Sequence, residues 1–129
     1  MEKNVQSFGL PWEREYGYVE PIRVRDTIYL AGQVGHDEHG SFEGFTTMEA
    51  QMRQAYRNAA RLLEAYGASM ENVVDEVLFV TDMDSAFAAR VACRSEVYGD
   101  QALVASTIVE IRRLAFPQLL VEIKFIAMV

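Results

Sequence analysis

The sequence predicts an α+β fold with the element order β-β-α-β-α-β-β, in which a mixed sheet carries two helices on one face. Five segments are rich in β-branched and aromatic residues, as strands are, and two segments repeat apolar residues every three or four positions, as helices do. Because strands and helices do not alternate strictly, a doubly wound parallel sheet is disfavoured. The length of 129 residues predicts one domain over residues 1–129.

The N-terminal part of the chain begins with residues 1–17, which have no clear period and are predicted to form an irregular arm. Residues 18–24 and 27–33 are two apolar runs separated by an Arg-Asp dipeptide, which is typical of a β-hairpin. Residues 36–43 are polar around a glycine, and this composition predicts a loop or a short third strand.

Two amphipathic helices are predicted in the middle of the chain. Thr46 and Glu49 have capping-box spacing, and the helix that they begin is expected to end at Gly67. Its apolar face is formed by Met48, Met52, Ala55, Tyr56, Ala59, Leu62, Leu63 and Tyr66. The second helix is expected to begin near Asp84 and to stop at Gly99. The side chains that it is expected to bury are Phe87, Val91 and Tyr98.

The remaining strands are predicted at residues 73–81, 103–113 and 119–128. In the last of them, alternate residues on both faces are mostly apolar. Two helices cover only one face of the sheet, so the other face would be exposed in a monomer. An apolar patch of that size favours self-association of the chain.

Composition excludes several classes of function. Lys and Arg total 12 and Asp and Glu total 19, so the net charge is 12 − 19 = −7, which disfavours binding to nucleic acid. The single cysteine, Cys93, cannot form an internal disulfide, which is typical of a reducing cytoplasm. The sequence also lacks an export signal and a stretch of about 18 apolar residues, so we expect a cytoplasmic protein without a membrane span.

Motifs for nucleotide, serine-hydrolase or zinc-protease chemistry are absent from the sequence. His36 and His39 lie in one polar loop with Asp37 and Glu38, but no third ligand has suitable spacing, so a solvated loop is favoured over a metal site. Cys93 has no histidine nearby to activate its thiol and is predicted to be inert. We therefore expect neither a metal nor another cofactor.

Glu122 is the most unusual residue of the sequence because it interrupts an apolar terminal strand, where ionised carboxylates are rarely buried without a partner. One interpretation is structural: Glu122 pairs across strands with Arg112, or with Lys124 on the same face. The other is functional: apolar surroundings raise the pKa of the carboxyl group so that it can orient or activate water. The sequence leaves both interpretations open.

Several short motifs occur in a specific order over most of the chain, from about residue 18 to residue 127. They are Tyr29-Leu30-Ala31-Gly32-Gln33-Val34-Gly35, Gln51 with Asn58 and Leu62-Leu63, Gly67-Ala68-Ser69, Asn72-Val73-Val74 and Val121-Glu122-Ile123. In these motifs the sequence resembles the Rid family of reactive-intermediate deaminases, also called YjgF-type or endoribonuclease L-PSP-like proteins.

The resemblance implies a chorismate-mutase-like fold that assembles as a homotrimer around a central barrel, which would cover the exposed sheet face. It also implies hydrolysis of 2-imino and enamine acids to 2-oxo acids and ammonia, in clefts between subunits and without a cofactor. This chemistry needs an anchor for the substrate carboxylate, backbone amides to hold it and an acid that delivers water to the imine carbon.

Three residues match the family's site. Glu122 aligns with the acid that handles water and is the predicted catalytic residue. Tyr18 aligns with a tyrosine that lines the cleft, and Gly32, in the family's Gly-Gln pair, is predicted to bind substrate with it.

Other positions depart from the family. Ser106 replaces the arginine that anchors the substrate carboxylate, Ile108 replaces a cysteine and Ala31 replaces a serine. Ser106 and Ile108 are still predicted to line the cleft, but the bidentate charged contact is lost. Arg112 or Arg113 would be a displaced anchor, which is disfavoured by their distance along the strand. A changed ligand without the usual α-carboxylate is the favoured interpretation.

The sequence therefore predicts a divergent Rid-family protein that acts on a small imine- or enamine-like metabolite by water addition in an intersubunit cleft. The alternative is a non-catalytic trimer that binds a small ligand or serves in an interaction. Ribonuclease activity, known for some relatives, is disfavoured by the net charge of −7 and the lack of a basic stripe.

Overall fold

The computed structural model describes residues 1–7 and 9–129. Its strands are β1 (Asn4–Val5), β2 (Pro21–Val24), β3 (Thr27–Gln33), β4 (Val73–Val80), β5 (Ala105–Glu110) and β6 (Val121–Met128). Its helices are α1 (Pro11–Tyr16), α2 (Met48–Glu64) and α3 (Met83–Tyr98), with a 3-10 turn, η1 (Met70–Asn72). The described strands form a six-stranded sheet in the order β1-β2-β3-β6-β4-β5. None of the described helices is long and apolar enough to cross a membrane.

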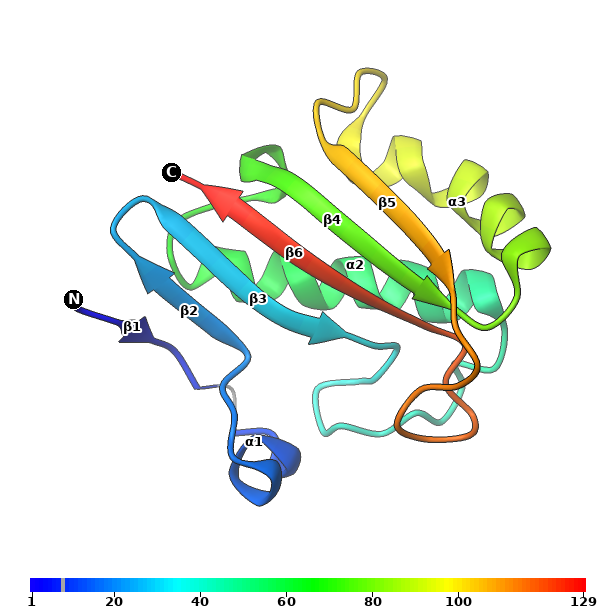
Figure 1. Ribbon diagram of the computed structural model, residues 1–129, viewed down its shortest axis with the longest axis horizontal. Helices are drawn as coiled ribbons and strands as arrows, with labels where there is room; N and C mark the ends of the chain where they lie inside the picture. The colour runs from blue at the N-terminus through cyan, green and yellow to red at the C-terminus, as the bar shows by residue number, and fades with distance from the viewer. Residues whose placement is uncertain (8) are drawn as a thin grey trace.

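The sheet is mixed, because β4 and β5 are parallel while the other pairs are antiparallel. In Figure 1, α2 and α3 lie side by side behind the sheet, and neither of them covers the opposite face. The α+β fold with two helices on one sheet face is thus confirmed.

The N-terminal segment is more regular than predicted. Outside residue 8, which is not among the described residues, the predicted irregular arm contains β1 and the six-residue α1. Pro11 begins α1, and Gly17 ends it in a left-handed conformation with φ of 74°. A helix of fewer than two turns has too few residues to show an apolar period, so the sequence pattern missed it.

The predicted β-hairpin is confirmed as β2 and β3, with Arg25 at a φ of 53° in the turn. Beyond it, β3 contains a bulge. Leu30 pairs with Phe125 and Gln33 pairs with Ile123, so two residues of β3 oppose one residue of β6. The bulge allows both Leu30 and Gln33 to be buried on the helix side. Ala31 and Gly32, between them, line a cavity on the other side.

The helix boundaries are close to the prediction, with differences in caps and faces. Thr47, one residue after the predicted Thr46, caps α2 by accepting a hydrogen bond from the backbone N–H of Ala50 at 3.1 Å. The predicted burial is wrong for Phe87 and Val91 on α3, which are 54% and 72% exposed, whereas Tyr98 packs partly buried against the core. The residues that α3 buries instead are Ala86, Ala89 and Cys93. These small side chains also recur at helical spacing, and their size allows close packing against α2.

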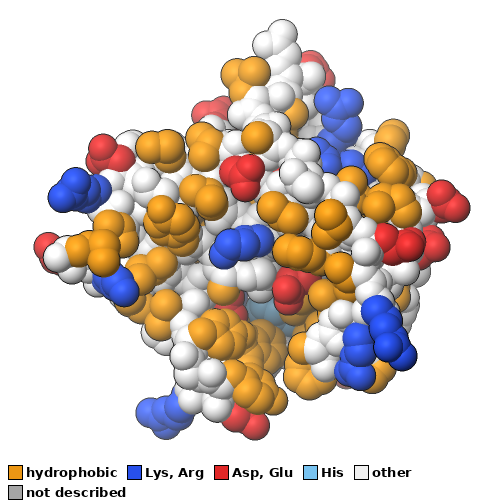
Figure 2. All heavy atoms as spheres, viewed as in Figure 1, with side chains coloured by type: hydrophobic (Ala, Val, Ile, Leu, Met, Phe, Trp, Pro, Cys, Tyr) orange, Lys and Arg blue, Asp and Glu red, His pale blue; other side chains and the backbone are white. Residues whose placement is uncertain are grey.

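The terminal strand β6 has the predicted alternation. Its buried residues, which lie under the helices, are Val121, Ile123, Phe125 and Ala127. Glu122, Lys124, Ile126 and Met128 point to the opposite face. Figure 2 shows hydrophobic side chains spread over that open face around a few charged ones. The predicted uncovered face is therefore present in the single chain.

A buried carboxylate ties the helices to the sheet edge. Glu76 on β4 has no exposed surface, and its carboxylate oxygens accept hydrogen bonds from the hydroxyls of Tyr56 (2.9 Å), Tyr98 (2.5 Å) and Ser106 (2.6 Å). Arg90 on α3 forms an ion pair with the same carboxylate at 3.1 Å. The cluster joins α2, α3, β4 and β5, so we expect it to stabilise the whole edge.

Replacement of Glu76 by alanine is expected to lower the free energy of unfolding by about 3–5 kcal/mol, because it leaves the Arg90 guanidinium without its buried counter-ion. Denaturant unfolding measures the change. The exposed Glu64→Ala is the matched control and is expected to remain within about 0.5 kcal/mol of the wild type. Equal effects of the two substitutions would contradict the role given to the cluster.

Candidate functional site

A cavity of about 490 Å³ opens on the open sheet face, at the β3 bulge. Its walls come from α1 and the segment after it, from β3, from the loops before α2 and β6, and from β6 itself. Its volume lies in the range of small-molecule sites. The residues that line it are Trp12, Tyr16, Tyr18, Glu20, Ala31, Gly32, Val34, His36, Phe42, Ala115, Phe116, Leu119 and Glu122.

One wall of the cavity is aromatic. Trp12 stacks on Phe42 with ring centroids 6.2 Å apart, and it contacts His36 edge-on at 4.9 Å. Phe42 packs against Phe116 at 5.5 Å. These rings come from α1 and two loops, so they are distant in sequence. Sequence patterns do not identify Trp12, Phe42 or Phe116 as site residues and indicate His36 only as a possible metal ligand, because loops and a helix as short as α1 have no readable period.

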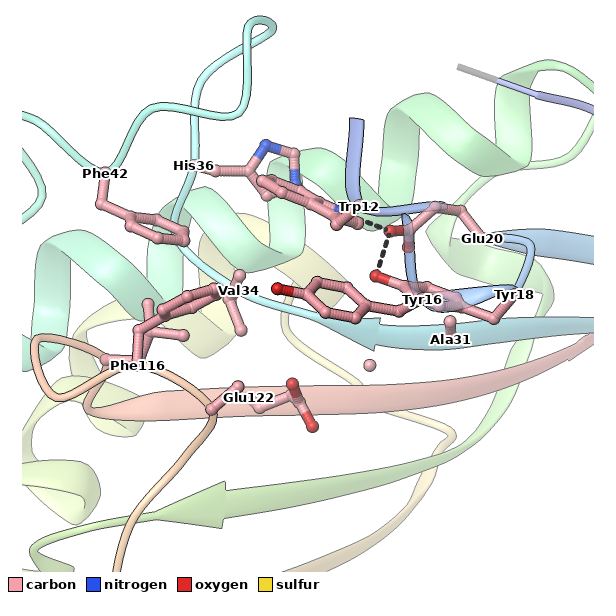
Figure 3. A pocket seen from close by; sticks show the side chains of 13 residues that line it. Trp12, Tyr16, Tyr18, Glu20, Ala31, Val34, His36, Phe42, Phe116 and Glu122 are labelled. Atoms are coloured by element: carbon pink, nitrogen blue, oxygen red, sulfur yellow. Dashed lines mark hydrogen bonds between the residues drawn. The ribbon is translucent and has the colours of Figure 1, made fainter. Parts of the chain in front are cut away.

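Glu20 forms the polar end of the cavity and is 3% exposed. Its carboxylate accepts hydrogen bonds from the Trp12 indole N–H at 2.9 Å, the Gln33 amide at 2.6 Å and the Tyr18 hydroxyl at 3.4 Å. Figure 3 shows Trp12 and Tyr18 converging on Glu20. All three donors are neutral side chains. They stabilise an ionised Glu20 by hydrogen bonds but do not neutralise its negative charge.

Tyr18 lies between α1 and β2 and points its hydroxyl into this cluster. Burial, followed by the negative charge of Glu20, raises the pKa of the Tyr18 phenol above its ordinary value. The phenol therefore keeps its proton at neutral pH and acts as a hydrogen-bond donor.

Glu122 projects from β6 on the opposite side of the cavity from Glu20 (Figure 3). Within residues 1–7 and 9–129, its carboxylate makes neither a hydrogen bond nor an ion pair. Burial, and then the charge of Glu20, raise the pKa of Glu122, whereas the charge of Lys124 lowers it. The structural interpretation, an ion pair with Arg112 or Lys124, is therefore not observed.

Gly32 allows Glu122 to occupy this position. A Cβ atom on Gly32 would lie 2.6 Å from Cδ, 2.7 Å from Oε2 and 2.8 Å from Cγ of Glu122. These separations are shorter than van der Waals contact, so any other residue at this position would displace the carboxylate. Tyr18, Gly32 and Glu122, predicted as site residues, thus line one cavity.

Ser106 and Ile108 lie elsewhere in the chain. They align in register with Glu76 and Leu78 of β4, on the face covered by the helices, and they do not line the cavity that holds Glu122. The Ser106 hydroxyl donates to Glu76 and accepts from Arg90 at 2.9 Å. A role for Ser106 and Ile108 in the same cleft therefore requires a second copy of the chain.

Neither arginine considered as a displaced anchor lines the cavity. Arg113 donates to the backbone carbonyl oxygens of Leu114 and Ala115, at 3.1 Å and 3.3 Å. Arg112 is exposed and is also absent from the lining. Lys and Arg are not found among the lining residues that the structure describes.

The histidine loop has the geometry of a hydrogen-bonded turn. The Asp37 carboxylate accepts from the backbone N–H groups of His39 (2.8 Å) and Ser41 (2.9 Å). Within the described part of the chain, no three His, Cys, Asp or Glu residues are grouped to hold a metal ion. His36 is buried instead, with Nδ1 2.6 Å from the Asp37 carbonyl oxygen, and it lines the cavity.

Cys93 is buried between the helices, and burial raises the pKa of its thiol, in keeping with an inert residue.

Comparison with known proteins identifies the family. A family model described as endoribonuclease L-PSP matches residues 12–129. The chain belongs to this family, the Rid or YjgF-type proteins. The resemblance to the Rid family that the sequence motifs indicate is thereby confirmed.

Relatives in the family differ in how much of each chain is similar. The RutC family protein YjgH of Escherichia coli is 30% identical over 84 residues, which are 65% of this chain and 63% of YjgH. A mouse 2-iminobutanoate/2-iminopropanoate deaminase is 35% identical over 69 residues, 52% of this chain and 50% of the enzyme. The crystal structure of Rv2704 from Mycobacterium tuberculosis, of the YjgF/YER057c/UK114 family, superposes with a TM-score of 0.85 and 27% identity, over 99% of this chain and 100% of that one.

Glu122→Gln is expected to raise stability at neutral pH. Because the pKa of Glu122 is higher in the folded chain than in the unfolded chain, its ionisation lowers the free energy of unfolding as the pH rises through the interval between the two values. The glutamine variant removes this loss. Its free energy of unfolding should therefore exceed that of the wild type at pH 7, and the gain should shrink as the pH falls to about 4, the ordinary value for glutamate.

Denaturant unfolding over this pH range measures the effect, with the exposed Glu43→Gln as a control that shows no such trend. A Glu122→Gln variant that loses stability at pH 7 would indicate a favourable partner for the carboxylate and contradict the assignment.

Proposed function

We propose that the protein hydrolyses the C=N bond of a small imine, or of the imine tautomer of an enamine, with Glu122 as the catalytic residue. The observation that supports this most is the unpaired Glu122 carboxylate, held against Gly32 in a cavity large enough for a metabolite. Burial raises the pKa of this carboxyl group, which makes it a stronger base than an ordinary glutamate for taking a proton from water and passing it to a nitrogen atom.

The proposed reaction has two steps. In the first step the imine is already protonated on nitrogen: the water oxygen bonds to the imine carbon while ionised Glu122 takes one proton of that water, which gives a neutral carbinolamine and a protonated Glu122. In the second step Glu122 donates this proton to the carbinolamine nitrogen and takes the hydroxyl proton as the C–N bond breaks, which gives the carbonyl product and ammonia. Glu122 then returns this proton to the ammonia, which leaves as ammonium. Tyr18 orients the reactants as a hydrogen-bond donor, with its hydroxyl beside Glu20. None of these steps needs a metal or another cofactor.

The relatives support this class of reaction. Curated relatives in mouse and in the mite Dermatophagoides farinae are named 2-iminobutanoate/2-iminopropanoate deaminases. Each match covers about half of both chains. The relatives therefore support C–N hydrolysis as a class, and the substrate of this chain is a separate question.

The substrate of this chain is proposed to lack the usual α-carboxylate. The position of the family's anchoring arginine is occupied by Ser106, which is bound to Glu76 and Arg90. A serine hydroxyl cannot replace the bidentate contact of a guanidinium group.

We also propose that the chain acts as a homotrimer in the cytoplasm. The open sheet face, which carries Tyr29, Ile126 and Met128, would be covered by such an assembly. A neighbouring copy would also be able to bring Ser106 and Ile108 to the cleft. Size-exclusion chromatography with light scattering should give three times the mass of one chain, 14.6 kDa. A monomer at micromolar concentration would contradict the assembly.

The catalytic proposal is tested by the decay of imines generated in place by an amino-acid oxidase or an amine oxidase and trapped with semicarbazide. Imines without an α-carboxylate should decay faster with the wild-type protein. Glu122→Gln should reduce that acceleration about 100-fold or more, as expected for loss of a general acid–base group.

Gly32→Ala is a second variant for the same assay. It should keep the free energy of unfolding within about 1 kcal/mol, since the Glu122 side chain can swing away, and still reduce the acceleration at least about tenfold. Acceleration that is unchanged by both substitutions would show that Glu122 is not the catalytic residue.

The alternative function is binding without catalysis. The observation that favours it is the loss of the anchoring arginine together with two polar groups of the wall, now Ile108 and Ala31. If no imine decays faster with the wild-type protein and a metabolite is bound in the cavity, the binding function is the correct one.

A further inference from the structure

The side chains that line the cavity indicate the shape and the charge of its ligand, which the proposed class of reaction does not specify. Trp12, Phe42 and Phe116 present ring faces or edges to one side, and Ala31, Val34 and Leu119 add apolar surface. Flat apolar groups pack well against such a surface, since aromatic contacts add to the free energy of burial.

The polar groups of the cavity are mostly acidic. Glu20 and Glu122 lie on opposite sides of the cavity (Figure 3). The carboxylate of Glu13, which is buried, accepts the Glu20 backbone N–H at 3.2 Å. None of the lining residues in the described chain is a lysine or arginine. The ionised cavity is therefore negative, and an anionic ligand would enter it without a counter-charge.

Two other groups affect this charge. Lys124 lies two residues from Glu122 on the same strand face, but it is exposed and does not line the cavity. His36 lines it and donates from Nδ1 to the Asp37 carbonyl oxygen, so its second ring nitrogen is the one that remains for a ligand. Neither provides the planar, bidentate donor that a carboxylate ligand needs.

We propose that this cavity binds ligands that combine a flat aromatic or similarly apolar body with a cationic nitrogen, namely amines and protonated imines. Trp12 and Tyr18 would contact the cation through their ring faces, and Glu20 and Glu122 would supply its counter-charge. The proposal rests on the proposed function in one respect, namely that the substrate occupies this cavity.

This ligand class fits the chemistry of C–N hydrolysis. Protonation makes the carbon of an imine more electrophilic, and a nearby carboxylate stabilises the cation that results. The same carboxylate can take the proton of the attacking water, which leaves the charge of the site unchanged overall. A substrate with a carboxylate would instead be repelled by Glu20 and Glu122.

The test uses three small molecules of the same shape. Benzamidinium is a planar cation that resembles a protonated imine, benzamide is its neutral counterpart and benzoate is the anion. Trp12 is the only tryptophan of the 129-residue chain and lines the cavity, so its fluorescence reports occupancy by each molecule. Isothermal calorimetry provides the dissociation constants independently.

Benzamidinium is expected to bind about tenfold more tightly than benzamide, and benzoate is expected to bind most weakly. Glu122→Gln should reduce the preference for the cation about threefold or more, and Glu20→Gln should do the same where its melting curve shows a folded protein. Glu71→Gln removes an equal charge at an exposed position outside the cavity and should leave the preference unchanged.

Benzoate that binds as tightly as benzamidinium would overturn the proposal and would indicate that another subunit supplies a cation. Equal affinities for benzamidinium and benzamide, or no binding of any of the three, would overturn it as well. The proposed catalytic function fails separately, when Glu122→Gln leaves imine turnover unchanged, because the binding experiment does not depend on turnover.

Discussion

The contact between Glu122 and Gly32 is the constraint on which the candidate site depends. The bulge in β3 turns Ala31 and Gly32 toward the cavity while Leu30 and Gln33 remain buried. Because Gly32 has no side chain, the Glu122 carboxylate lies against the β3 backbone, where a Cβ atom would be 2.6 Å from its Cδ. Among the residues that the structure describes, this carboxylate has no ionic partner, so it remains able to exchange protons.

The protein holds the buried Glu76 and the half-buried Glu122 in opposite ways. Glu76 accepts three hydroxyl donors and pairs with Arg90, and this arrangement stabilises the edge of the sheet. Glu122 has no such partner in the described chain and faces a cavity. The contrast separates an acid that serves stability from one that we propose for catalysis, since unpaired acids with shifted pKa values are typical of functional sites.

Most of the fold follows from sequence patterns, and most of the cavity does not. The alternation in β6 and the period of α2 reflect burial on one face, so they are readable from the sequence. The buried face of α3 cannot be predicted in the same way, because two sets of apolar residues, one large and one small, both recur at helical spacing. Packing against α2 buries the small set, Ala86, Ala89 and Cys93.

The aromatic wall of the cavity has no periodic signal in a single sequence. It is formed by tertiary contacts between loops and the short α1, which bring together Trp12, Phe42 and Phe116. Glu122 can be recognised as a candidate site residue from the sequence, because an ionised carboxylate in an apolar strand is rarely buried without a partner.

The state of the Glu122 carboxyl group is tested most directly by an NMR titration of the protein with glutamate carboxyl carbons labelled by ¹³C. The Glu122 resonance is assigned by its absence in Glu122→Gln. We expect this carboxyl group to titrate above the ordinary glutamate pKa of about 4.3. A Glu122 that titrates at or below that value would contradict the catalytic role proposed for it, because it would be an ordinary or ion-paired carboxylate and not a group suited to exchange protons at the imine.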